Sequence, residues 1–105
     1  MEMLIPPTLT KLQTAMIYAS EADVINMAVF GKTAKQWQAI GKGHIRDQAT
    51  LEQLIIISNL ESINALLIRN GLTQHQRLTT LNKTAIQQMK SLLNNPSLKQ
   101  LENKT

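Results

Sequence analysis

Histidines and clustered polar residues are the side chains of this chain that could do acid–base chemistry or bind a metal. His44 and His75 lie far apart in the sequence, and the chain has no cysteine. Two isolated histidines are too few for a metal site built from protein ligands alone. Ser20, Glu21 and Asp23 form a polar cluster, but the start of a helix accounts for all three. Motifs such as G-x-S-x-G and G-x-G-x-x-G are absent, so we predict no enzyme and no catalytic, cofactor or metal site.

Basic residues occur in two stretches that lack acids, one between Asp23 and Asp47 and one between Glu61 and Glu102. Two interpretations remain open. Either these stretches form solvated helix faces rich in Lys, Gln and Asn, or they form a surface that contacts phosphate groups or a partner. The candidate contact residues are Lys32, Lys35, Lys42, Arg46, Arg77, Lys83 and Lys90.

A polar loop between Gly41 and Asp47 is a second candidate site, with His44, Arg46 and Asp47 as its chemically active side chains. The alternative is structural: Asp47 caps a helix, or pairs locally with Arg46 or with a neighbouring helix.

Length and composition restrict the remaining classes. The chain has 105 residues, a formal charge of +4 and only 3% aromatic residues. This length predicts a single domain. Three aromatic residues cannot build the stacking platform of a single-strand nucleic-acid binder, whereas the basic balance permits weak, non-specific contact with a polyanion. The start resembles no secretory signal, and the uncharged apolar stretches are shorter than the ~20 residues of a membrane span. We therefore expect a cytoplasmic protein that does not enter a membrane.

Four segments begin with a helix cap. Ser20 precedes two acids, and three threonines are each followed three positions later by glutamine, which is the pattern of a capping box. The predicted helices follow Ser20, Thr33, Thr50 and Thr73 and end near Gly31, Gly41, Gly71 and Asn95.

The two long segments predict the core. Ile56, Leu60 and Ile63 form one helical stripe, which we expect to be buried against a stripe at Leu78, Leu81 and Ala85. The resulting fold is all-α: a small bundle of four main helices, the last two long and antiparallel, with an N-terminal arm that contains Pro6 and Pro7. The expected divisions are an arm at 1–19, a helical domain at 20–95 and a short C-terminal helix or tail at 96–105. The helix from position 51 is apolar on more than one face, which predicts a homodimer.

A resemblance to a known family lies in three strings: LIPPTLT, IYASEADVINMAVFGKTAKQW and HIRDQATLEQLIIISNLESINALLIRNGLTQHQRLTTLNKTAIQQMK. They resemble the C-terminal part of KilA-N domain-containing proteins of bacteria, prophages and other mobile elements, over roughly residues 4–93. The resemblance implies an accessory domain standing without the KilA-N module, the inferred DNA-binding part of that family. The loop departs from the family's G-N-I-R-D-Y-A, because His44 and Gln48 replace an Asn and a Tyr.

These observations together predict a non-enzymatic accessory domain that mediates self-association or protein–protein contact in a DNA-linked system. The expected partners are a second copy of the chain and a separately encoded KilA-N protein. The alternative is a small module that binds nucleic acid weakly and without sequence preference through a basic helix face.

Overall fold

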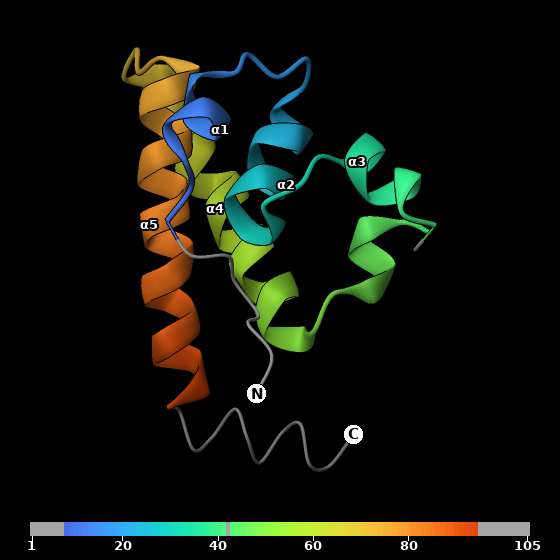
Figure 1. The fold of residues 1–105 in the computed structure, drawn as a ribbon. Coiled ribbons are helices and arrows are strands. Elements are labelled where there is room, and N and C mark those ends of the chain that lie inside the picture. Colours follow the sequence, from blue (N-terminus) through green and yellow to red (C-terminus); the bar gives the residue numbers. More distant parts are fainter. Residues whose placement is uncertain (1–7, 42, 95–105) are drawn as a thin grey trace.

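Helices make up the regular structure of the computed structural model, which describes residues 8–41 and 43–94. No strand occurs in these two ranges, so the all-α prediction is confirmed. The predicted arm contains one short helix of its own, and a 3₁₀-helix forms in the predicted loop. The described ranges therefore hold five α-helices, where four main helices were expected. In chain order the elements are α1 (Lys11–Ala15), α2 (Glu21–Phe30), α3 (Ala34–Ala39), the 3₁₀-helix η1 (Ile45–Gln48), α4 (Leu51–Arg69) and α5 (Gln74–Leu93) (Figure 1).

The predicted caps start the helices. Thr33, Thr50 and Thr73 each accept a hydrogen bond from the backbone N–H three residues later, and the glutamine at that position accepts one in return from the threonine N–H. Ser20 accepts from the backbone N–H of Asp23 at 3.2 Å. Gly31 ends α2 with φ at 71°, a left-handed conformation that favours glycine. Local hydrogen bonding within three residues therefore determines where these helices begin.

The core lies where α2, α4 and α5 meet. Val24 of α2, Leu60 of α4 and Leu81 of α5 are fully buried. The predicted stripe is confirmed at Ile56 and Leu60, whereas Ile63 is only partly buried at the margin of the core. Two long helices and one shorter helix thus share a single apolar centre, which holds most of the buried hydrophobic side chains.

The N-terminal arm is attached to α5 by side chains of α5. Gln74 pairs with both backbone polar groups of Tyr18, accepting from its N–H at 2.7 Å and donating to its carbonyl at 3.0 Å. His75 Nδ1 lies 2.9 Å from the carbonyl of Thr14. Asn82 accepts from the N–H of Leu9 at 3.3 Å and donates to the carbonyl of Ala28 on α2 at 3.0 Å. These bonds hold the arm along α5, as Figure 1 shows.

Helix α3 and η1 contact each other and lie to one side of the α2–α4–α5 core (Figure 1). The Trp37 ring of α3 lies 6.2 Å from the Phe30 ring of α2, and Trp37 is partly buried. The contact attaches α3 to the end of α2. The prolines of the arm, Lys42 and the predicted C-terminal helix or tail at 96–105 lie outside the described residues.

Candidate functional site

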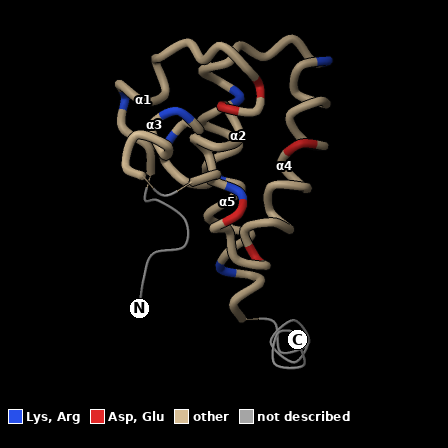
Figure 2. The backbone as a smooth tube through the Cα atoms, turned by 90° about the vertical axis from the view of Figure 1, so that its right-hand side faces the viewer, with Lys and Arg blue, Asp and Glu red and all other residues tan. Residues whose placement is uncertain are grey.

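The basic side chains predicted as contacts come from separate parts of the chain. Lys83 and Lys90 are exposed on α5, a helix without any Asp or Glu. Lys35 is exposed on α3, and Lys32 is partly buried just before it. Figure 2 shows basic positions distributed over several elements with acidic positions between them. Among the predicted contacts that the structure describes, Lys83 and Lys90 are the two that share one face of one helix.

Arg77 is not available for a surface contact, which corrects its prediction as a contact residue. It is only 7% exposed, and its guanidinium pairs with the Glu21 carboxylate of α2 through both terminal nitrogens. It also donates to Asn64 Oδ1 of α4 at 2.9 Å and to the Leu72 carbonyl at 3.3 Å. Hydrogen bonds from Arg77 hold the pKa of Glu21 below its usual range. The physical reason for the burial is that Arg77 joins the three core helices.

The loop residues form no convergent site. Arg46 in η1 lies 3.5 Å from the Glu61 carboxylate of α4, with both side chains well exposed. The predicted local pairing of Arg46 with Asp47 does not occur, because Glu61 of α4 takes that place. His44 and Asp47 are exposed, and the Asp47 side chain makes no hydrogen bond within the described part of the chain. An exposed pair such as Arg46–Glu61 contributes about 0–1 kcal/mol, so it positions the loop only weakly.

Metal chemistry finds no support in the described ranges, where no group of three or more His, Cys, Asp and Glu side chains lies together. His75 bonds the arm, whereas His44 lies exposed ahead of η1. A cavity of about 210 Å³ between α2 and α4 has Glu21 and Glu61 in its lining, but Glu21 is already engaged by Arg77.

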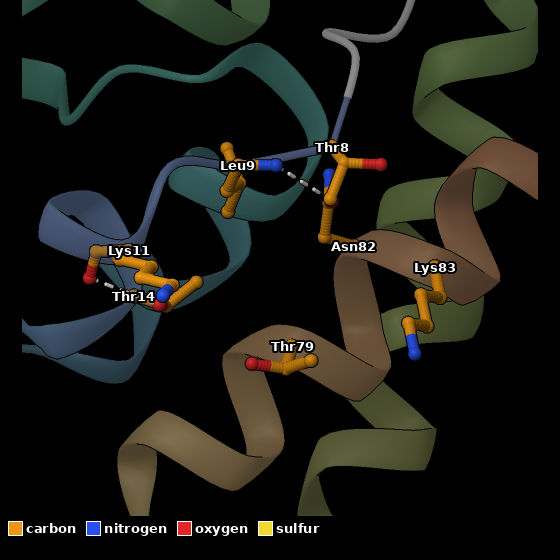
Figure 3. Close-up of a pocket in the computed structure, with 7 residues that line it drawn as sticks. All are labelled: Thr8, Leu9, Lys11, Thr14, Thr79, Asn82 and Lys83. Carbon is orange, nitrogen blue, oxygen red and sulfur yellow. Dashed lines mark hydrogen bonds between the residues drawn. The ribbon is translucent and has the colours of Figure 1, made fainter.

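The structure has a hollow of about 120 Å³ between the arm and α5 (Figure 3). The sequence patterns do not predict it. Lys11 of α1 and Lys83 of α5 are both among the residues at its edge. These residues are 72 positions apart, so no spacing in the sequence could have linked them. The residues that line the hollow are Thr8, Leu9, Lys11, Thr14, Thr79, Asn82 and Lys83.

Helix α4 exposes several large apolar side chains, which is unusual for a helix face in contact with water. Leu51, Leu54, Leu66 and Ile68 keep 42%, 44%, 55% and 46% of their surface exposed. Figure 2 shows α4 at one edge of the molecule, away from α1 and α3. We call these four side chains, with the exposed small residues Ser58, Ser62 and Ala65 between them, the outer face of α4.

By length and composition α4 is also the one helix in the described ranges that could cross a membrane, a property shared by the core helices of folded domains. A third of its most apolar window is buried inside the structure, where Ile56 and Leu60 belong to the core. The expectation of no membrane stays a prediction.

Comparisons with known proteins do not assign a site or a function to the chain. No protein-family model, no curated protein and no solved structure matches the chain.

Proposed function

We propose that this chain is a non-enzymatic interaction domain that self-associates through the outer face of α4. The single observation that carries the proposal is the set of four large apolar side chains left half-exposed on one side of a core helix. Large apolar side chains that stay exposed in number on one helix are a feature of surfaces that contact another molecule.

The side chains lie in two groups, one near the start of α4 and one near its end. Leu54 and Ile68 are 14 positions apart, and Leu51 and Leu66 are 15 apart, both close to four helical turns. Ser58, Ser62 and Ala65 lie between these pairs and are small enough to let a second helix approach closely. A helix of a second copy, laid along α4, would contact apolar side chains near both ends.

The energetics favour a weak, concentration-dependent dimer. Covering the exposed half of a leucine or isoleucine is worth about 1 kcal/mol, so eight such side chains in a dimer contribute about 8 kcal/mol. Association costs about 4–15 kcal/mol in lost freedom of motion. The balance is at best about −4 kcal/mol, a dissociation constant of about 1 mM, so a dimer at high micromolar concentration needs polar contacts as well.

The packing of α4 against α5 would hold the outer face of α4 in position. We infer that α4 and α5 run in opposite directions within a small bundle. Asn64 near the end of α4 bonds to Arg77 near the start of α5, and Asn59, earlier in α4, bonds to Gln88, later in α5. The order of these pairs supports the antiparallel arrangement. Packing along α5 would keep the outer face of α4 straight and accessible.

The N-terminal arm is the competing cover for this face. Leu9 is buried and its backbone is bonded to Asn82 of α5, so it does not serve that purpose. Leu4 and Ile5, two other apolar residues of the arm, lie outside the described residues. A second copy of the chain is therefore the occupant that the proposal commits to.

Sedimentation velocity tests the proposal. The wild-type chain should show a sedimentation coefficient that rises with concentration, whereas a Leu54→Lys, Leu66→Lys double variant should remain monomeric because charge on the outer face opposes its burial. Leu12→Lys is the matched control, since Leu12 is an even more exposed leucine on α1. A wild-type chain that stays monomeric at high micromolar concentration would contradict self-association.

The biological setting is part of the same proposal. The strings from 4 to 93 support an accessory domain of a KilA-N-type protein of a prophage or mobile element, cytoplasmic and linked to DNA. A separately encoded KilA-N protein would be its second partner. Co-purification with the product of a neighbouring KilA-N reading frame tests this, and loss of that contact in the Leu54→Lys, Leu66→Lys variant would assign it to the same face.

A second candidate function has its own observation. Lys83 and Lys90 are exposed on a helix without carboxylates, and neither forms an ion pair with another described residue. These features support weak nucleic-acid binding without sequence preference, at dissociation constants of about 10⁻⁴–10⁻⁶ M or weaker at physiological salt.

A further inference from the structure

The described part of the N-terminal arm is attached to the rest of the molecule through a few separate side chains. Leu9, Thr14 and Tyr18 are buried, and the residues between them are exposed or only partly buried. Leu12 and Ile17, although apolar, keep 74% and 90% of their surface exposed. The arm therefore lacks the continuous buried stripe of a core helix and is held by spaced anchors, as a bound peptide is.

Helix α5 binds the backbone of the arm with its side chains. Gln74 accepts from the N–H of Tyr18 and donates to its carbonyl. Asn82 accepts from the N–H of Leu9, as Figure 3 shows, and His75 Nδ1 lies 2.9 Å from a carbonyl oxygen of α1. In peptide recognition, bonds to the main chain give affinity and a few buried side chains give specificity. None of these contacts requires the arm to be joined covalently to α2.

The arm also has internal bonds that a separate segment could make. Thr10 and Gln13 form a capping box at the start of α1. The Tyr18 hydroxyl donates to the Gln13 carbonyl, and the Thr14 hydroxyl donates to the carbonyl of Lys11. Because these bonds lie within the arm, they reduce the conformational freedom that the segment must lose when it binds.

The contact between the arm and α5 is incompletely packed. The hollow of about 120 Å³ lies between them, with Leu9, Thr14 and Asn82 in its lining. Atoms on either side of such a space lose part of their mutual attraction. Segments with few buried apolar contacts open at a lower free energy than the core does. The arm is therefore expected to detach from α5 while α2, α4 and α5 remain packed.

We propose that the side of α5 beneath the arm is a peptide-binding site, which the chain's own arm occupies and which the arm of a second copy can occupy in its place. The same anchors and the same backbone bonds would hold the segment in both cases. The tethered arm has the advantage of a high effective concentration, so exchange between copies requires that this arm first be weakened. The proposal concerns α5 and the arm, and it is independent of self-association through the outer face of α4.

Fluorescence anisotropy tests the site with a labelled synthetic peptide of residues 8–20. The peptide is titrated with the wild-type chain and with a Tyr18→Ala chain, whose own arm has lost an anchor. The apparent affinity of a site rises with the fraction of molecules in which it is free, so the peptide should bind the Tyr18→Ala chain about tenfold more tightly. Ile17→Ala is the matched control, because Ile17 is exposed, and this chain should bind like the wild type. Leu9→Ala provides a second chain with a weakened arm, and circular dichroism verifies that each variant is folded.

Peptide variants determine which side chains the site recognises. With the Leu9→Ala chain as receptor, a peptide carrying Tyr18→Ala should bind about tenfold more weakly than the wild-type peptide, whereas one carrying Ile17→Ala should bind equally well. The peptide lacks α4, so a negative result leaves self-association through α4 untouched. A peptide that instead adhered through its exposed apolar side chains would lose affinity with Ile17→Ala. That result, or a peptide that binds neither the Tyr18→Ala nor the Leu9→Ala chain, would overturn the proposal.

Discussion

Replacing Arg77 with methionine tests the ion pair that joins the three core helices. The guanidinium makes two bonds to Glu21, one to Asn64 and one to the Leu72 carbonyl. Methionine replaces the apolar stem of arginine but not its guanidinium, so the change removes the charge and the donors while most of the packing of the stem is kept. The buried Asn64 would lose a hydrogen-bond partner, and so would the backbone of Leu72.

The expected loss follows from burial. Breaking a fully buried ion pair by removing one partner costs about 3–5 kcal/mol. The Glu21 side chain is half-exposed and can be solvated once Arg77 is gone, so that part of the loss is smaller. The unpaired Asn64 amide oxygen adds the penalty of an unsatisfied polar group, about 1–3 kcal/mol. We expect Arg77→Met to lower the free energy of unfolding by about 2–4 kcal/mol.

Urea denaturation followed by circular dichroism measures this loss. Arg69→Met, a substitution at an exposed arginine near the end of α4, is the control and should change stability by less than about 0.5 kcal/mol. A double-mutant cycle with Glu21→Gln separates the pair from the other bonds of Arg77. A loss of under 1 kcal/mol for Arg77→Met would refute the reasoning, since it would mean that the pair contributes no more than an ordinary surface contact.

Three further predictions concern the core, acid stability and nucleic acid. Leu60→Ala should cost about 2–5 kcal/mol in urea denaturation because Leu60 is fully buried, and a loss under 1 kcal/mol would contradict that packing. Because the pKa of Glu21 is lowered in the folded chain, its stabilising contribution is complete above pH 4.5, its usual value, and is lost as the pH falls below it. In Glu21→Gln the free energy of unfolding should change less with pH in this acidic range. An unchanged pH dependence would show that Glu21 is not its cause. Lys83→Glu with Lys90→Glu should abolish weak DNA binding in a gel-shift titration while leaving the helical spectrum intact, whereas tight, sequence-selective binding by the wild type would place nucleic-acid recognition first.

Helix boundaries were predictable because the bonds that set them are local. A threonine at Thr33, Thr50 or Thr73 meets its glutamine partner three residues on, and nothing distant is needed. The same pattern at Thr10 and Gln13 caps α1, and it could have been found by applying the rule to the arm. The core stripe was predictable at Ile56 and Leu60 because the 3.6-residue period places both on one face.

The candidate sites were less predictable because they depend on tertiary contacts. Glu21 and Arg77 are 56 positions apart, so no local pattern indicates that this arginine is buried. Glu61, rather than the adjacent Asp47, pairs with Arg46 because η1 lies against α4. The exposed apolar side chains of α4 were anticipated as an excess of hydrophobic residues. Which of them lie outside the core is determined by where α2 and α5 pack.

A single spin label on the outer face of α4 tests the central claim most directly. The chain has no cysteine, so Ser58→Cys provides one labelling position near the middle of that helix, and Thr80→Cys provides a control on the exposed side of α5. Helices packed face to face lie roughly 8–10 Å apart, so pulsed dipolar spectroscopy should find a short, well-defined distance between two labels at position 58. The label at position 80 should give a longer or broader distribution. Dipolar signals at position 58 that show no such short distance, at concentrations where sedimentation detects a dimer, would contradict self-association through α4.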